Sequence, residues 1–174
     1  HPSGLACGDL NGDDREDIAI CGNQLIIYYN YQSGFITSEA DTIPSYLCEI
    51  KIADIDNNGS NEIIGVDWGM PGTQKRLLIY SNNGTDNFQL VYSKWIDEAM
   101  GRIFISDLNN DNYPDVIYNV SYSYPNSEYE LFHTYILFNN QDGTFQDPVN
   151  YYTGICSHKS FSADFDGNGW NDII

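Results

Sequence analysis

Basic residues are scarce in this chain of 174 residues, which has 7 Lys and Arg against 25 Asp and Glu and a formal net charge of -18. Nucleic-acid binding depends on a basic surface, and anionic membrane surfaces attract basic segments. The chain also lacks the run of about 18 apolar residues that a membrane span requires. We therefore expect neither nucleic-acid partners nor insertion into a membrane.

Cysteine is sparse as well, and the four cysteines show no C-x-x-C spacing, which argues against a zinc or redox site. Cys7 and Cys21 flank one short segment. One interpretation is a disulfide between them, with Cys48 and Cys156 as the second pair. The other is that all four are small buried apolar side chains. The sequence leaves both interpretations open.

Helical periodicity is missing too, since no segment keeps it over about 11 residues. Short apolar runs separated by Asn- and Gly-rich turns are frequent instead, as expected for strands and hairpins. With 41% hydrophobic and 14% aromatic residues, the chain has enough apolar surface for a core. The sequence therefore predicts an all-β fold.

An acidic nine-residue pattern occurs four times and organises the chain. We call the copies loops 1 to 4; they are residues 9–17, 54–62, 107–115 and 164–172. Each copy has Asp, Asn or Glu at positions 1, 3, 5 and 9 and an apolar residue at position 2. Position 6 is a residue that tolerates a left-handed backbone. Four copies that share all these features are not an accident of composition.

The spacing of the loops indicates a known architecture. They start at residues 9, 54, 107 and 164, so they lie 45, 53 and 57 residues apart. A period of roughly 40–50 residues with several short strands is typical of a β-propeller blade. We predict three full four-stranded repeats plus the start of a fourth, in one repeat domain over residues 1–174. The units are expected to start near residues 5, 50, 103 and 160.

The oxygen-rich loops match the chemistry of calcium, which takes six to eight oxygen ligands at roughly 2.3–2.6 Å. Side chains at positions 1, 3 and 5 place oxygens inside a tight turn, the carbonyl at position 7 adds one, and position 9 closes the cage. We predict about four Ca²⁺ sites, one per loop. The predicted ligand residues are Asp9, Asn11, Asp13, Arg15 and Asp17; Asp54, Asp56, Asn58, Ser60 and Glu62; Asp107, Asn109, Asp111, Tyr113 and Asp115; and Asp164, Asp166, Asn168, Trp170 and Asp172.

Other interpretations of the loops are weaker. Mg²⁺ resists losing its water, and transition metals prefer His or Cys, neither of which lies within a loop. Asp- and Asn-rich turns that bind nothing are common, because these residues favour turns. Four copies at blade spacing favour metal sites over such turns.

These loops resemble the FG-GAP/VCBS repeat family, whose members include the integrin α-subunit propeller. The resemblance covers loops 1 to 4 and the Phe-bearing hairpins between them. It implies propellers of about seven blades, with Ca²⁺ loops joining the first two strands of a blade. It also implies an extracellular location and a role in adhesion, glycan binding or as an accessory domain. Because the chain holds fewer repeats than such a ring, and stops at Ile174 inside an expected strand, we expect a fragment of a larger propeller.

Two further kinds of site are predicted. Aromatic residues in or near irregular segments could stack on sugar rings, and Trp68, Tyr122 and Tyr124 are the candidates; Trp95 is expected in the core instead. Sequons occur at Asn58, Asn83 and Asn119. Because Asn58 is also a predicted metal ligand, Asn83 and Asn119 are the glycosylation candidates of a secreted glycoprotein.

The function predicted is that of a calcium-binding extracellular module, secreted or at the cell surface, that recognises a protein or glycan ligand. The alternative is a structural segment of a larger extracellular assembly or fibre. A propeller domain of a polysaccharide-active enzyme is less favoured, because the chain shows no nucleophile motif and its three His residues are scattered. We therefore expect no enzymatic activity and no catalytic residues.

Overall fold

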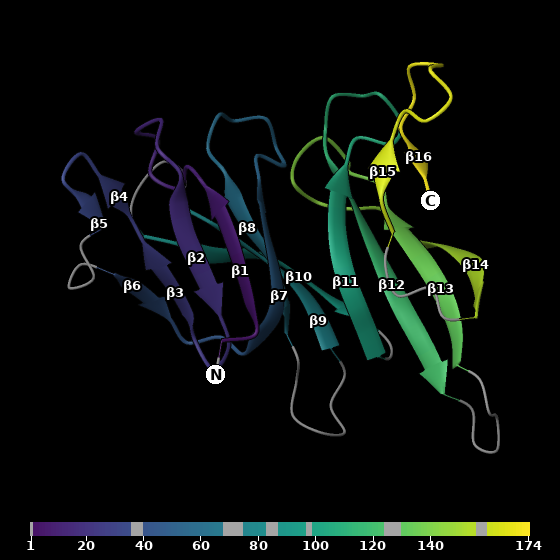
Figure 1. Cartoon of the computed structure of the whole chain (residues 1–174), viewed down its shortest axis with the longest axis horizontal. Coiled ribbons are helices and arrows are strands. Elements are labelled where there is room, and N and C mark those ends of the chain that lie inside the picture. Colours follow the sequence, from purple (N-terminus) through teal and green to yellow (C-terminus); the bar gives the residue numbers. More distant parts are fainter. Residues whose placement is uncertain are drawn as a thin grey trace. The chain divides into compact units, whose positions relative to one another are not determined.

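The computed structural model describes residues 2–35, 40–67, 75–82, 87–96, 99–123, 130–155 and 160–174. Regular structure in these segments consists of strands alone (Figure 1). The chain forms two compact units, His1–Ile96 and Asp97–Ile174, which we call unit 1 and unit 2. Among the described residues, no helix is long and apolar enough to cross a membrane.

Unit 1 contains two four-stranded antiparallel sheets. The first consists, in spatial order, of β1 (Gly4–Gly8), β2 (Asp17–Cys21), β3 (Leu25–Tyr28) and β6 (Asp41–Ile43). The second has the order β10 (Gln89–Ile96), β9 (Lys75–Ser81), β8 (Glu62–Asp67) and β7 (Leu47–Ala53). A small hairpin of β4 (Asn30–Tyr31) and β5 (Gly34–Phe35) follows β3.

The described part of unit 2 contains one four-stranded sheet of the same kind. Its four-stranded sheet has the order β11 (Ala99–Ser106), β12 (Asp115–Ser123), β13 (Glu130–Leu137) and β14 (Val149–Ile155). A further pair follows, β15 (Ser162–Ala163) with β16 (Asp172–Ile173). The prediction of an all-β chain is confirmed, and each sheet is an antiparallel meander as expected for a blade. Closure into a propeller and the number of blades stay predictions.

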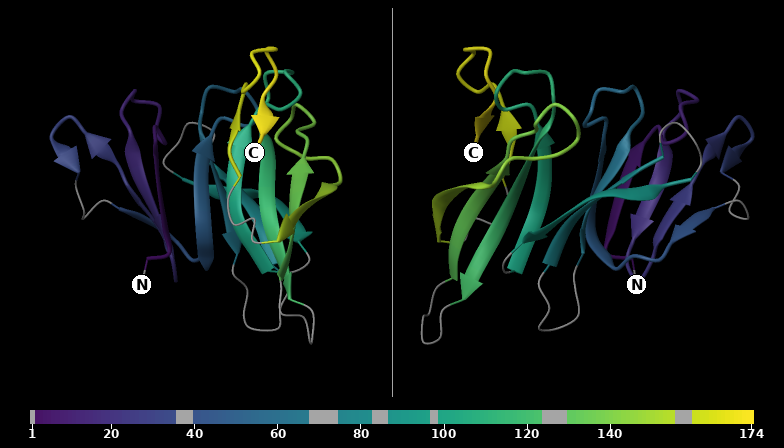
Figure 2. Two further views of the ribbon diagram at one scale, coloured as in Figure 1. Left: turned by 45° about the vertical axis from the view of Figure 1, so that its right-hand side comes forward. Right: turned by 180° about the vertical axis from the view of Figure 1, so that it is seen from behind.

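The two sheets of unit 1 enclose an apolar core. Leu25, Ile27, Leu47 and Ile50 are at most 1% exposed and belong to one cluster contributed by both sheets. Glycine in β1 permits the close approach to β7, because a Cβ on Gly8 would lie 2.5 Å from Cγ2 of Ile52. Figure 2 shows β1 and β7 side by side in unit 1. Dry packing of this kind fixes the strand ends from which loops 1 and 2 emerge.

The structure tests both interpretations of the cysteines. The β1–β2 ladder pairs Cys7 with Ile18 and Cys21 with Gly4, so the two cysteines lie at opposite ends of the hairpin. This register excludes the interpretation with a Cys7–Cys21 disulfide, and the interpretation of four buried side chains fails as well, because Cys7 is exposed. Cys7, Cys21 and Cys48 are free thiols, of which only Cys21 is fully buried. Cys156, the expected partner of Cys48, lies outside the described residues.

The aromatic candidates have mixed outcomes. Trp95 is not a core residue, because its side chain is 60% exposed and carries the guanidinium of Arg76 at 5.3 Å from the ring centre. Trp68 and Tyr124 lie outside the described residues. Tyr122 is part of β12, but the described structure does not include its side chain. Stacking of these three residues on sugars stays a prediction.

One sequon is incompatible with the folded chain. The side chain of Asn119 is 2% exposed, and its Oδ1 accepts hydrogen bonds from the hydroxyls of Thr134 (3.0 Å) and Ser160 (3.1 Å). A glycan on its Nδ2 would need space inside the core of unit 2. The structure therefore corrects the prediction for Asn119, while Asn83 lies outside the described residues.

Candidate metal centre

Each acidic loop joins the first two strands of a sheet. Loop 1 connects β1 to β2, loop 2 connects β7 to β8, loop 3 connects β11 to β12, and loop 4 connects β15 to β16 (Figure 1). This is the place that the family resemblance implied for the calcium loops. The strand that follows begins at position 9, so the last predicted ligand of every loop is anchored in a sheet.

The backbone turns back on itself twice in each loop. Position 6 has a positive φ in all four copies, as predicted; the residues are Asp14, Gly59, Asn112 and Gly169. Position 4 has one as well, which the sequence analysis missed although only Gly and Asn occur there; the residues are Gly12, Asn57, Asn110 and Gly167. Gly and Asn are the residues that adopt this conformation most easily. The two left-handed residues curl the loop so that its amides point inward.

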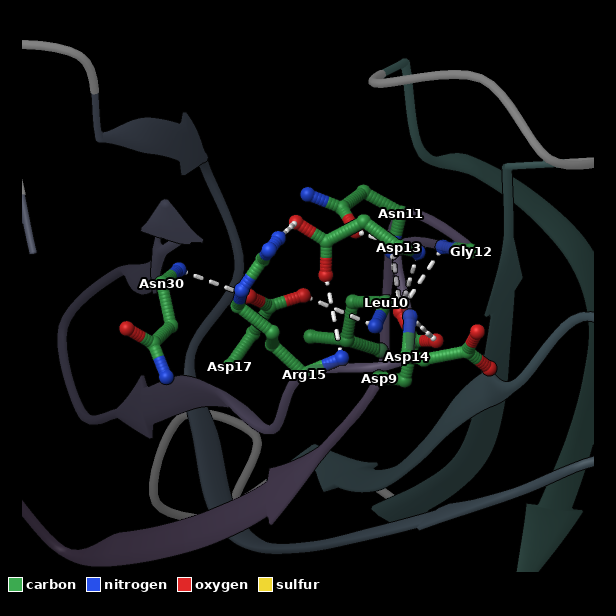
Figure 3. A network of polar contacts seen from close by, with 9 residues as sticks. All are labelled: Asp9, Leu10, Asn11, Gly12, Asp13, Asp14, Arg15, Asp17 and Asn30. Carbon is green, nitrogen blue, oxygen red and sulfur yellow. Dashed lines mark hydrogen bonds and ion pairs between the residues drawn. The ribbon is translucent and has the colours of Figure 1, made fainter. Parts of the chain in front are cut away.

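The carboxylate at position 1 organises this curl, as Figure 3 shows for loop 1. Oδ1 of Asp9 accepts a hydrogen bond from the backbone N–H of Gly12 at 2.7 Å, and Oδ2 accepts one from Asp14 at 2.8 Å. The same hydrogen bond, from the N–H of position 6 to the carboxylate of position 1, occurs in the other three loops at 2.9 Å. The pairs are Gly59 with Asp54, Asn112 with Asp107, and Gly169 with Asp164. Position 1 therefore faces the inside of every loop.

Positions 3 and 5 face inward through short local turns. In loop 1 the side-chain oxygen of Asn11 accepts from the N–H of Asp13 at 3.1 Å, and Oδ1 of Asp13 accepts from Arg15 at 3.0 Å. Equivalent bonds occur in the other three loops, formed by Asp56 and Asn58, Asn109 and Asp111, and Asp166 and Asn168. Each oxygen that accepts one N–H keeps a further lone pair for a cation.

Position 9 ties the loop to the sheet. Asp17 is 0% exposed; its Oδ2 accepts from Leu10 N and its Oδ1 from Asn30 N, both at 2.8 Å (Figure 3). Asp115 makes the equivalent bonds with Leu108 N and Asn139 N, each at 2.9 Å. The carboxylate thus joins the start of the loop to the end of the third strand, a scaffold role that the sequence analysis missed.

Loop 2 replaces one of these bonds. Oε2 of Glu62 accepts from Ile55 N at 3.0 Å, while Oε1 accepts from the hydroxyl of Ser81 at 3.0 Å. In loop 4, Oδ2 of Asp172 accepts from Phe165 N at 3.0 Å. The apolar residue at position 2, whose N–H is the donor in each case, is buried in unit 1, where Leu10 and Ile55 are 2% and 1% exposed. Phe165, its counterpart in loop 4, is 52% exposed.

Carboxylates converge in two of the loops. Oxygens of Asp54, Asp56 and Glu62 lie within 4.8 Å of one another, and so do those of Asp164, Asp166 and Asp172. Two oxygens that bind one Ca²⁺ at about 2.4 Å are at most about 4.8 Å apart. Three negative groups therefore lie at separations that a single ion spans. The donor set contains oxygen alone, which fits a hard cation such as calcium and not a transition metal.

Loops 1 and 3 differ because position 3 is Asn and the third carboxylate is at position 5. In loop 1, Oδ2 of Asp13 forms an ion pair with Nη1 of Arg15 at 2.7 Å. In loop 3, Oδ2 of Asp111 accepts from the side-chain amides of Asn109 at 3.1 Å and Gln141 at 3.3 Å. In these two loops, side-chain donors therefore already bind one carboxylate oxygen at position 5. A cation would compete with them for that oxygen.

The electrostatic state of the carboxylates follows from their surroundings. Burial raises the pKa of Glu62 to about 7, although the N–H of Ile55 and the hydroxyl of Ser81 act in the opposite direction. Burial also raises the pKa values of Asp17 and Asp115, with smaller increases from the neighbouring carboxylates of their own loops. For Asp9, four backbone N–H groups outweigh the effect of burial and lower the pKa. A bound divalent cation would favour the charged form of every one of these groups.

Comparison with known proteins gives a match for the C-terminal part of the chain. Residues 107–174 match the family model of the FG-GAP-like repeat. The chain contains an FG-GAP-like repeat. The matched region starts at position 1 of loop 3 and includes all of loop 4, so the predicted family is confirmed. The repeat is of the β-propeller type and indicates an interaction module. No curated protein matches the chain.

Proposed function

We propose that this protein is a calcium-binding, extracellular interaction module in which Ca²⁺ fixes the hairpins of FG-GAP-like repeats. The observation that carries the proposal is the convergence of three carboxylates in loop 2 and again in loop 4, with all oxygens within 4.8 Å. Without a cation, like charges at such distances raise the free energy of the folded loop. With one, the same charges favour binding, and metal affinity adds to folding stability.

The residues that would hold the ion are those at positions 1, 3, 5 and 9, with the carbonyl at position 7 as an additional ligand. Calcium would supply two positive charges, which offset most of the negative charge of the loop. The protein contributes the arrangement, because inward-pointing amides fix positions 1, 3 and 5 and the sheet fixes position 9. The role of the ion is structural, and recognition of a protein or glycan takes place on other surfaces of the blades.

An extracellular location and the lack of enzymatic activity belong to this proposal. Calcium sites of modest affinity fill in calcium-rich surroundings such as the extracellular space, where sites of extracellular modules bind with Kd of roughly 0.1–1 mM. The alternative function, a structural segment of a larger extracellular assembly or fibre, stays a prediction, and no observation specifically favours it.

The proposal is tested by calorimetric titration with CaCl₂ and by thermal unfolding with and without chelator. We expect calcium to bind and to raise the melting temperature. Glu62→Gln removes the negative charge of a predicted ligand and should weaken binding, whereas Glu16→Gln removes an exposed carboxylate at position 8 of loop 1 and serves as the matched control. No heat of binding together with an unchanged melting temperature in chelator would overturn the proposal.

A further inference from the structure

The four loops belong to two alternating classes. Loops 1 and 3 carry Asn at position 3 and Asp at position 5, whereas loops 2 and 4 carry Asp at position 3 and Asn at position 5. Position 8 follows the same alternation; its residues are Glu16, Asn61, Pro114 and Asn171. The repeating element is therefore a pair of loops, with Asn at position 8 only in the second member.

The Asn at position 8 reaches the preceding loop. Nδ2 of Asn61 donates a hydrogen bond to the backbone carbonyl of Asp9 at 2.8 Å, so loop 2 contacts position 1 of loop 1. Nδ2 of Asn171 donates to the backbone carbonyl of Asp107 at 2.9 Å, so loop 4 contacts position 1 of loop 3. The same contact thus occurs at equivalent positions in both units. Neither an ionised Glu nor a Pro could donate it from position 8 of loops 1 and 3.

Each pair has a second connection. In unit 1, Nδ2 of Asn82 donates to the backbone carbonyl of Leu10, and the neighbouring Ser81 donates to Oε1 of Glu62 at 3.0 Å. In unit 2, Nδ2 of Asn110 donates to the backbone carbonyl of Gly169 at 2.7 Å. In unit 2 the second hydrogen bond therefore links the two loops directly, whereas in unit 1 the second connection runs from Leu10 through Asn82 and its neighbour Ser81 to Glu62.

We propose that calcium binds cooperatively within each pair, loops 1 and 2 in unit 1 and loops 3 and 4 in unit 2, with Asn61 and Asn171 as positioning residues that transmit the coupling. This inference rests on the proposed calcium function. Asn61 lies between the predicted ligands Ser60 and Glu62, so an ion in loop 2 fixes its backbone. With its backbone fixed, Asn61 holds the Asp9 carbonyl more firmly through its side-chain amide. Loop 1 then loses less conformational entropy when its own ion binds.

Charge opposes this coupling only in part. Loop 2 contains three predicted ligand carboxylates, Asp54, Asp56 and Glu62, and one Ca²⁺ neutralises two of the three charges. The filled loop keeps a net negative charge and does not repel the ion that enters loop 1, but it attracts that ion less than the empty loop does. Salt screens this opposing effect, and the ordering through Asn61 must exceed it. The same count applies to loop 4 beside loop 3, with Asp164, Asp166 and Asp172.

The test is a calcium titration of the full chain followed by NMR, in which one backbone amide reports on each loop: Gly12, Gly59, Asn112 and Gly169. We expect the amides of Gly12 and Gly59 to follow one steep common curve in the unchanged protein. Asn61→Ala should weaken binding at Gly12 about fivefold and make its curve shallow, although it removes no ligand of loop 1. Asp56→Asn, which weakens calcium binding in loop 2 itself, should lower the calcium affinity reported by the Gly12 amide by a similar factor. The double variant Asn61→Ala/Asp56→Asn should lower that affinity no further than either single variant.

The matched control is Asn23→Ala, which truncates an exposed Asn in the β2–β3 turn and should leave all four curves unchanged. Asn171→Ala should alter the curves of Asn112 and Gly169 and spare those of Gly12 and Gly59. Independent, non-cooperative titration of Gly12 and Gly59 in the unchanged protein would overturn the inference without the need for any variant. If the loops titrate independently but all of them bind calcium, the proposed function still holds. If no amide responds to calcium, both the inference and the proposed function are overturned.

Discussion

Nη1 of Arg15 lies 2.7 Å from Oδ2 of Asp13, so a cationic side chain occupies one oxygen of a predicted calcium ligand in loop 1. Loop 2 has Ser60 at the same position, and its N–H bonds Asn58 without any competing charge. The pair in loop 1 is partly exposed, and such pairs contribute little stability on their own. Its importance is the competition with a cation for Asp13.

The first prediction concerns this competition. Arg15→Ser removes one positive charge from loop 1 and frees Oδ2 of Asp13, so calcium affinity at the Gly12 amide should rise about threefold. The control is Arg102→Ser, which removes an exposed positive charge from β11 in the other unit and should leave Gly12 unaffected. An unchanged or weaker affinity in Arg15→Ser would show that the ion pair does not compete with calcium.

The second prediction separates the scaffold role of position 9 from metal binding. Asp17→Ala leaves the N–H groups of Leu10 and Asn30 without their acceptor, and the Leu10 N–H is buried. The free energy of unfolding should fall by about 3 kcal/mol even in chelator, because an unpaired buried donor retains its full desolvation cost. Denaturant unfolding in EDTA measures this.

A comparison with position 3 completes that experiment. Asp56→Ala removes a predicted ligand whose Oδ1 accepts from an exposed N–H, that of Asn58. In EDTA, Asp56→Ala should lower the free energy of unfolding clearly less than Asp17→Ala does. Calcium should stabilise both variants less than it stabilises the unchanged protein. Equal losses for the two variants in EDTA would contradict the special role of position 9.

The third prediction concerns the left-handed residue at position 4. Gly12 has φ of +77°, and a Cβ built on it meets nothing within 4 Å, so any cost of substitution is conformational. Gly12→Ala should destabilise the protein by about 1 kcal/mol. Gly12→Asn should cost less, because Asn57 and Asn110 adopt this conformation at the same position of loops 2 and 3. Thermal unfolding of both variants provides the check, and a smaller loss for Ala than for Asn would contradict it.

The fourth prediction concerns the thiols. Burial raises the pKa of Cys48 to about 11. At pH 8 about one thiol in a thousand is then ionised, and because the thiolate is the reactive form, alkylation by iodoacetamide should be slow. Its rate should rise about tenfold for each pH unit up to about 11. Peptide mass spectrometry after timed labelling measures the rate.

The same experiment examines the disulfide interpretation. The exposed thiol of Cys7 serves as the internal control for reagent activity. Without any reductant, peptides containing Cys7 and Cys21 should appear with reduced masses, since the ladder keeps the two residues apart. Labelling of Cys48 at pH 8 as fast as that of Cys7 would show that its surroundings do not raise the pKa of Cys48.

The all-β class, the loop positions and the left-handed residue at position 6 could be predicted from the amino-acid sequence. These features are local: strand periodicity and turn chemistry depend on neighbouring residues, and four copies made the pattern of Asp9, Asp54, Asp107 and Asp164 unmistakable. Position 4 could have been found in the same way, since only Gly and Asn occur there. The FG-GAP-like match to residues 107–174 confirms the family that this pattern indicated.

The hydrogen-bond partners of these loops could not be predicted from the sequence, because they depend on how the sheets pack. The acceptors for Asn30 N and Asn61 Nδ2 lie 13 and 52 residues away in sequence, and no local pattern specifies such pairs. The register of β1 on β2 separates Cys7 from Cys21, and the packing of unit 2 buries Asn119 while Trp95 stays exposed. Residue types fix which oxygens a loop can offer, whereas strand register and sheet packing determine which oxygens meet and which loops contact each other.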